Sequence, residues 1–152
     1  MQKLNLPNHP IKLVKENNRT LVFDPIRKKY VVNTPEEWVR QNFIQFLIQE
    51  KKYPASLMAV EKGIELGKVK KRCDIVLYNN EGKPIIIVEC KAPSITISQN
   101  AFDQIARYNM TLKTELLIVT NGLDHFTCLM DHENKRYQFL KETPDYKTFL
   151  KQ

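Results

Sequence analysis

The chain has 152 residues, of which 42% are hydrophobic and 27% are charged, so it is long enough to form one domain with its own core. Its longest aliphatic run is far below the roughly 20 residues of a membrane-spanning helix, which excludes a transmembrane segment. The net charge of +7 permits binding to a polyanion such as nucleic acid.

The N-terminal third predicts a β-rich extension followed by a helix. Apolar segments between polar turns predict short strands at residues 11–14, 21–23 and 30–32. Thr34 is a good N-cap and is followed by Pro35 and two acidic residues, as is typical of a helix start. One apolar face at helical spacing then extends the helix to about Lys51; its residues are Val39, Phe43, Phe46 and Leu47.

The rest of the chain predicts a meander, a helix and a final hairpin. The expected strands are residues 57–66, 73–78, 85–91, 116–120, 126–130 and 136–140, and the expected second helix begins near Ser98. The basic run 68–72 is expected to form the turn between the first two of these strands. Strands interleaved with helices predict an α/β fold, with a mixed central β-sheet flanked by helices. We expect one domain, 1–152, comprising the extension (1–33), a core (34–130) and a C-terminal hairpin and tail (131–152).

The stretch "IIIVECK" raises a specific question, because buried strands rarely end in unpaired charges. Alternate side chains of a strand share a face, so Glu89 and Lys91 point the same way. In the preceding strand, Asp74 is expected on the face of Val76 and Tyr78. If the two strands pair antiparallel across the "NNEGKP" turn, Asp74 comes close to Glu89 and Lys91.

Two carboxylates held by rigid strands form a hard-oxygen site that suits Mg²⁺ or Mn²⁺. Such a metal can bind a phosphate oxygen and activate a water molecule. Lys91 could then hydrogen-bond the attacking water or stabilise negative charge in the transition state. The alternative is that Glu89 and Lys91 form a simple salt bridge where the strand leaves the core.

Several motifs in this order resemble a known nuclease group. Asp74 followed by Glu89-Cys90-Lys91 resembles the PD-(D/E)xK nuclease superfamily, and "QIARY" resembles the Gln-x-x-x-Tyr element of its RecB-like branch. The segments "DPIRKKYVVNTPEEWVRQNFIQFL", "KKRCDIVLYN", "VECKAP" and "NGLDHF" together are similar to the N-terminal nuclease domain of type I restriction enzyme R subunits. This resemblance covers most of the chain, from about Asp24 to Phe126.

The resemblance implies a restriction-endonuclease-like core and a set of residue roles. Asp74 and Glu89 match the metal-binding acids, and Lys91 matches the catalytic lysine. A glutamate of the first helix often completes the metal site, for which Glu36 is the first choice and Glu37 the second. The remaining expected site residues are the catalytic pair Gln104 and Tyr108 and the nucleic-acid contacts Lys68, Lys70, Lys71, Arg72 and Arg40. Arg40 could instead pair with a site carboxylate or be an ordinary surface residue.

The resemblance therefore predicts a Mg²⁺-dependent DNA endonuclease related to restriction-modification enzymes. Two alternatives stay open: a non-catalytic DNA-binding or assembly module with the same fold, and an α/β domain with no nucleic-acid role. No recognition helix is evident, so DNA binding without sequence specificity is expected. No GxxxxGK[ST] loop is present, so ATP hydrolysis by that mechanism is not expected. The resemblance implies a motor or specificity subunit as a partner. Three widely spaced cysteines predict reduced thiols in a cytoplasmic protein.

Overall fold

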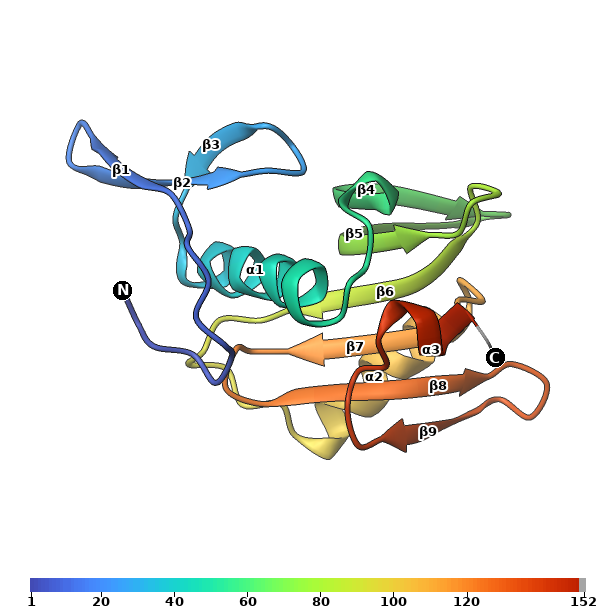
Figure 1. The fold of residues 1–152 in the computed structure, drawn as a ribbon. Helices are drawn as coiled ribbons and strands as arrows, with labels where there is room; N and C mark the ends of the chain where they lie inside the picture. The colour runs from blue at the N-terminus through green and yellow to red at the C-terminus, as the bar shows by residue number, and fades with distance from the viewer. Residues whose placement is uncertain (151–152) are drawn as a thin grey trace.

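The computed structural model describes residues 1–150 as two β-sheets with helices packed around the larger one (Figure 1). The large sheet has the order β4-β5-β6-β7-β8-β9, and all its neighbours pair antiparallel except β6 and β7. Its strands are β4 (Met58–Leu66), β5 (Val69–Tyr78), β6 (Pro84–Cys90), β7 (Leu116–Thr120), β8 (His125–Asp131) and β9 (Arg136–Leu140). The predicted mixed α/β fold is therefore confirmed.

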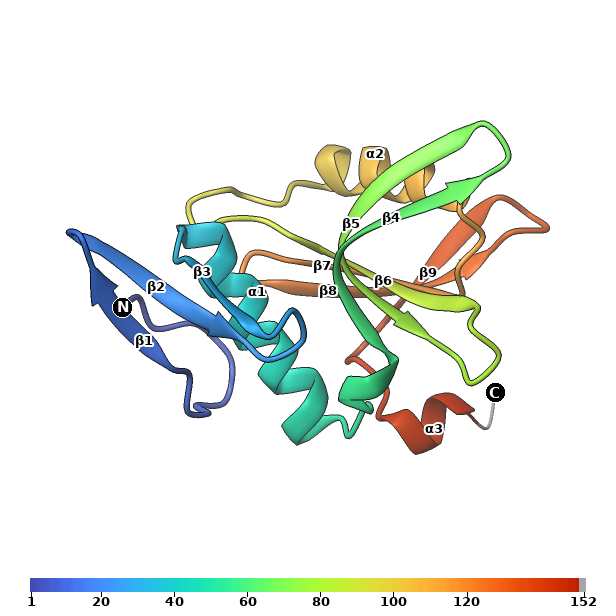
Figure 2. The same ribbon diagram turned by 90° about the horizontal axis from the view of Figure 1, so that it is seen from above.

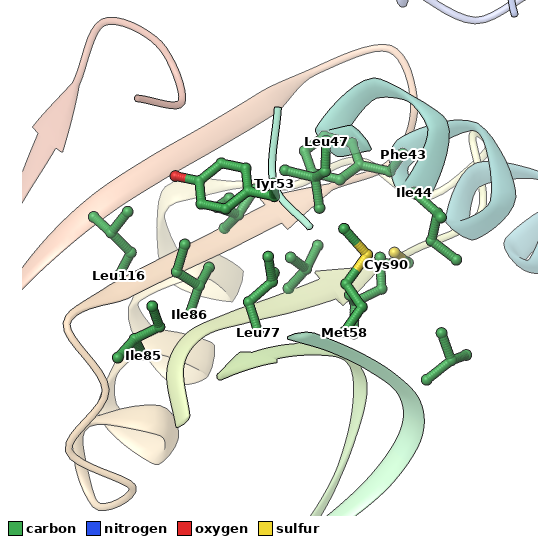
Figure 3. Packing of buried hydrophobic residues seen from close by; sticks show 14 of the residues in the cluster. Phe43, Ile44, Leu47, Tyr53, Met58, Leu77, Ile85, Ile86, Cys90 and Leu116 are labelled. Carbon is green, nitrogen blue, oxygen red and sulfur yellow. The ribbon is translucent and has the colours of Figure 1, made fainter. Parts of the chain in front are cut away.

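Helices cover both faces of the large sheet (Figure 2). Helix α1 (Pro35–Gln45) packs on one face and α2 (Gln99–Met110) on the other. Two apolar clusters fill the resulting layers, one with Phe43 of α1 and one with Phe102 of α2. Figure 3 shows side chains of the first cluster, including Ile86 of β6 and Leu116 of β7. The carboxyl end of β6 therefore emerges between two helices.

The start of α1 follows from its local sequence. The Thr34 hydroxyl accepts a hydrogen bond from the Glu37 backbone N–H at 3.0 Å, as expected of an N-cap. Val39 and Phe43 are buried, which confirms the predicted apolar face. The α-helix ends at Gln45, however, and the residues expected to continue it form a π-helical turn, Phe46–Glu50. The spacing of apolar residues alone does not predict such a π-helical turn.

The predicted extension forms a separate antiparallel sheet of β1 (Leu13–Glu16), β2 (Arg19–Asp24) and β3 (Lys29–Val32). The segment before it docks on the "NGLDHF" turn. The Asn5 backbone N–H donates to the Gly122 carbonyl at 2.8 Å, and Leu4 packs against Gly122. A Cβ at Gly122 would come within 2.8 Å of Leu4, and its φ of +85° also favours glycine.

The C-terminal part is integrated into the large sheet and its core. Strand β9, in the expected hairpin and tail, pairs with β8. A short helix that was not predicted, α3 (Tyr146–Leu150), places Phe149 in the α1-side core. The three cysteines are buried and free. Within residues 1–150, no helix has the length and apolar character needed to cross a bilayer.

Candidate active site

Asp74 and Glu89 come together where the ladder between β5 and β6 ends. The last pair at this end is Ile75 with Val88, so Asp74 and Glu89 are the next residues on the two strands. The Cys90 backbone N–H donates to Asp74 Oδ2 at 2.8 Å, which holds the carboxylate against β6. Both groups are shielded from solvent, with side-chain exposures of 13% for Asp74 and 11% for Glu89.

Burial dominates the electrostatics of this carboxylate pair. It raises the pKa of Asp74, against the lowering effects of the Cys90 N–H and the Arg40 guanidinium. Burial also raises the pKa of Glu89, and the Asp74 charge raises it further, whereas Lys71 lowers it. Both pKa values stay above their ordinary range because the surrounding cations do not compensate for burial. A further cation would therefore stabilise the two ionised carboxylates.

The strand alternation that predicted the face of Asp74 does not hold. Cys73 and Val76 are three residues apart yet pack in the same cluster on the α2 side. Asp74 instead faces Arg40 of α1 at 3.5 Å. The neighbouring strand β4 is irregular at the same level: Glu61 has a φ of +56°, and no pair is formed between Val60↔Ile75 and Lys62↔Cys73. The prediction that Asp74 shares a face with Val76 is therefore wrong, although Asp74 still reaches Glu89.

Arg40 is an internal residue that links three carboxylates. It donates to Glu37 through Nε at 3.0 Å and through Nη2 at 3.2 Å. Its Nη1 donates to Glu61 at 2.6 Å and lies 3.5 Å from Asp74. The Arg40 side chain is only 7% exposed. Of the roles considered for Arg40, the structure favours pairing with a site carboxylate over contact with DNA phosphate. Glu61 also belongs to this network, and the sequence did not predict it as a site residue. Its φ is positive, which is uncommon inside a strand and has no recognisable sequence pattern here.

The Arg40→Met variant should lose about 3 kcal/mol of unfolding free energy, because breaking this buried network removes the ion pair of Asp74 and leaves Glu37 with Arg27 as its remaining cation. Urea denaturation at neutral pH measures this loss. Arg107→Met is the matched control, because Arg107 is exposed on α2. A loss below about 1 kcal/mol for Arg40→Met would contradict the structural role.

The two first-turn glutamates of α1 have different surroundings. Glu37 is buried and accepts hydrogen bonds from Arg27 Nη2 at 2.8 Å and from Gln41 Nε2 at 3.0 Å. Glu36 is exposed, and partial burial together with the negative charge of Asp74 raises its pKa. Glu36 therefore carries an exposed carboxylate that the charge of Asp74 influences, whereas Glu37 belongs to the internal network.

Lys91 follows β6 directly, and its charge influences three carboxylates. Its backbone N–H donates to the Thr120 carbonyl at 2.8 Å, which fixes the chain just beyond the strand. Its positive charge lowers the pKa values of Glu36, Asp74 and Glu89. Within residues 1–150, its ammonium makes no ion pair with any of them, so the simple Glu89–Lys91 salt bridge is not formed. The Lys91 ammonium is therefore available to another anion.

The basic run does not form the turn that was predicted for it. The turn comprises Gly67 and Lys68, and the remaining basic residues belong to β5. Lys70 is 76% exposed and lies 3.6 Å from Glu65. Arg72 is 69% exposed and donates to Glu61 at 3.0 Å. Lys68 and Lys70 thus stay accessible at the end of the β4–β5 hairpin.

Lys71 points in the opposite direction, toward the candidate site. Its ammonium forms an ion pair with Glu89 Oε1, lies 4.8 Å from the ring centroid of Tyr108 and is 3.4 Å from Asn109 Oδ1. Tyr108 is thereby connected to the site through Lys71. Gln104 is exposed, and within the described chain it makes no side-chain hydrogen bond. The structure therefore brings Tyr108 to the site and leaves Gln104 at the surface of α2.

The donor set at Asp74 and Glu89 suits a hard divalent cation. Both ligands are carboxylates, and Mg²⁺ typically takes one or two of these while keeping several waters. Across residues 1–150, no three acidic, histidine or cysteine side chains already converge as a complete metal site. The fit therefore rests on the carboxylate pair, whose raised pKa values indicate incompletely neutralised charge.

A sequence comparison decides the family. The profile of the type I restriction enzyme R protein N terminus (HSDR_N) matches residues 35–144. The chain belongs to this family. The matched region of the R protein N terminus contains every residue described above at the carboxylate pair, from Glu36 of α1 to Tyr108 of α2.

One solved structure is similar to this R protein N-terminal domain. It is the fragment structure of a protein assigned as the HsdR subunit of a type I restriction enzyme from Vibrio vulnificus YJ016. The TM-score is 0.47 and the sequence identity is 20%, over 71% of the present chain and 23% of the Vibrio chain. The matched part of the chain thus spans about a quarter of that fragment's length. No curated protein sequence matches the chain.

Proposed function

We propose that this domain is a metal-dependent DNA endonuclease that hydrolyses phosphodiester bonds within a type I restriction enzyme. One observation carries the proposal: two carboxylates from adjacent strands, both largely shielded from solvent, meet beside a lysine that makes no ion pair with residues 1–150. Membership of the R protein family supports a role in restriction. The PD-(D/E)xK assignment rests on the motif resemblance.

The proposed roles follow from the surroundings of each side chain. Asp74 and Glu89 would hold Mg²⁺ or Mn²⁺, with Glu36 as an additional carboxylate at the solvent side. When bound, such an ion supplies Lewis acidity toward a phosphate oxygen and lowers the pKa of a water molecule. Lys91 would stabilise charge that develops on the phosphate, because its ammonium is positioned by β6 and is not committed to a carboxylate. Gln104 would contact the DNA strand from the surface of α2.

DNA is the proposed substrate, bound through its backbone without sequence preference. The exposed Lys68 and Lys70 of the β4–β5 hairpin are the proposed phosphate contacts, together with Arg72. Lys71 and Arg40, which were predicted to contact DNA, are engaged inside the protein. A motor or specificity subunit is the proposed protein partner. The cytoplasmic location stays a prediction.

Replacing both Lys68 and Lys70 with Ala should reduce the slope of log affinity against log salt concentration by about 2, because each phosphate contact contributes roughly 0.9. Fluorescence anisotropy with a short DNA duplex in Ca²⁺ measures this slope. The control is the Lys12→Ala, Lys15→Ala double variant, which removes the same charge near β1, at the other end of the molecule (Figure 2). Equal slopes for both double variants would exclude the hairpin as a DNA contact.

Incubation of supercoiled plasmid with the purified domain tests the proposed activity. Nicked and linear products should form with Mg²⁺ or Mn²⁺ and should be absent with EDTA. A competing function, a non-catalytic DNA-binding module, is favoured by the fact that Arg40 and Lys71 already pair with the two carboxylates. DNA binding without any cleavage in either metal would support this second function.

A further inference from the structure

Lys71 forms an ion pair with Glu89, although the sequence predicted that Lys71 contacts DNA. The Lys71 side chain is 15% exposed, and its ammonium contacts Glu89 Oε1, one of the oxygens that the proposed function assigns to metal binding. An ammonium and a metal dication cannot occupy the same carboxylate oxygen without strong mutual repulsion.

Helix α2 holds Lys71 in this place. The Tyr108 ring lies under the ammonium at 4.8 Å, a geometry of cation–π attraction, and Asn109 Oδ1 accepts at 3.4 Å. Asn109 is itself fixed, because its side-chain amide donates to the Ile105 carbonyl at 2.8 Å. The Tyr108 hydroxyl donates to the Lys70 carbonyl at 3.2 Å, which ties α2 to the backbone next to Lys71.

We propose that Lys71 is a displaceable counter-ion that occupies Glu89 in the metal-free domain and sets the metal affinity of the site. Tyr108 and Asn109 are then positioning residues, because they act through Lys71 and retain its ammonium when it leaves Glu89. This proposal rests on the proposed function, since it requires that Glu89 binds metal. It gives Tyr108 a role at the metal site that does not require contact with DNA.

The structure also explains why a cation is needed at Glu89 before metal binds. Glu89 is buried, and an ionised buried carboxylate without a partner destabilises the folded state. Lys71 supplies this partner from within the fold. Removing its charge should therefore lower stability without metal and make the domain more dependent on an external cation.

Calorimetric titration with Mn²⁺ tests the proposal in three variants of the intact chain. Lys71→Gln and Lys71→Met should each bind Mn²⁺ about tenfold more tightly than wild type, because the competing charge is absent. The glutamine amide can still donate to Glu89, so Lys71→Gln keeps the test usable if Lys71→Met does not fold. Lys71→Arg retains the charge and should stay within about twofold of wild type. Lys62→Met is the matched control, because Lys62 is exposed on the neighbouring strand β4.

Thermal unfolding with and without Mn²⁺ supplies a second measurement. The rise in Tm on adding Mn²⁺ should be larger for Lys71→Gln than for wild type, since tighter binding to the folded state gives greater stabilisation. If wild type binds Mn²⁺ and Lys71→Gln binds it equally or more weakly, the counter-ion proposal is overturned while the proposed function stands. If neither protein binds Mn²⁺, the metal site itself, and with it the proposed function, is overturned.

Discussion

Asp74→Asn and Glu89→Gln should each weaken Mn²⁺ binding by more than about 100-fold. Replacing a residue that only hydrogen-bonds a metal ligand typically costs up to about 100-fold, so a larger loss indicates a direct ligand. The reason is that a neutral amide is a poor ligand for a hard dication, and the pair supplies the two carboxylates where the β5–β6 ladder ends. Isothermal titration calorimetry measures the effect. Asp131→Asn is the control, because Asp131 is the last residue of β8, far from the carboxylate pair in the sheet, and its side chain is 42% exposed.

The same titration should depend on pH in a defined direction. Burial raises the pKa values of Asp74 and Glu89, so protons compete with metal at higher pH than for ordinary carboxylates. Mn²⁺ affinity should therefore increase as pH rises through these pKa values. An affinity that stays constant from about pH 4 to pH 7 would show that neither carboxylate binds the ion.

The unfolding free energy of Asp74→Asn shows whether this variant is still folded when its Mn²⁺ binding is measured. A carboxyl group whose folded pKa is raised stabilises the fold at low pH, and this contribution is lost as pH rises through that pKa. Asp74→Asn should consequently be at least as stable as wild type at neutral pH, and its advantage should disappear in acid. Loss of Mn²⁺ binding without loss of stability would then report on the site alone.

Lys91→Ala should reduce the rate of DNA cleavage by about 100-fold or more, comparable to the loss of one oxyanion donor. A cation that acts mainly on the transition state affects the rate more than binding. DNA affinity should thus change by less than about tenfold, because one phosphate contact among several is lost. Single-turnover cleavage in Mg²⁺ and a DNA titration in Ca²⁺ separate the two quantities.

Lys91→Arg should recover only part of the activity, because guanidinium is larger and planar and does not accept a proton. Lys62→Ala, which removes an exposed charge of β4, is the matched control for the change in net charge. Cleavage by Lys91→Ala at the wild-type rate would show that Lys91 has no catalytic role. The free ammonium beside three carboxylates would then serve only to balance their charge.

Local sequence signals predicted much of this fold. Short-range patterns predicted the Thr34 N-cap, a helix that begins near Ser98, the antiparallel meander and strand β9 at residues 136–140, and the structure confirms these features. The juxtaposition of Asp74 and Glu89 followed from counting outward from one turn. These features depend on residues that are close together in the chain, so local sequence patterns are enough to predict them.

The features that sequence could not provide depend on contacts between distant elements. The basic run gave no sign that Lys71 faces Glu89 while Lys70 faces solvent, because that distinction is set by the position of α2. For Arg40 the sequence left open a DNA contact, a pair with a site carboxylate and an ordinary surface position, and only the fold shows that Glu37, Glu61 and Asp74 surround it. The side-chain alternation breaks near Asp74 at the level where Glu61 of β4 has a positive φ, and no local motif signals such a conformation.

Cleavage of supercoiled plasmid by wild type and Asp74→Asn, prepared and assayed in parallel, tests the central claim most directly. Wild type should cut the plasmid in Mg²⁺ or Mn²⁺, and Asp74→Asn should show no cleavage above the EDTA background while remaining folded. Cutting by Asp74→Asn at the wild-type rate would contradict the account, because the observed nuclease would not use the carboxylate pair of β5 and β6.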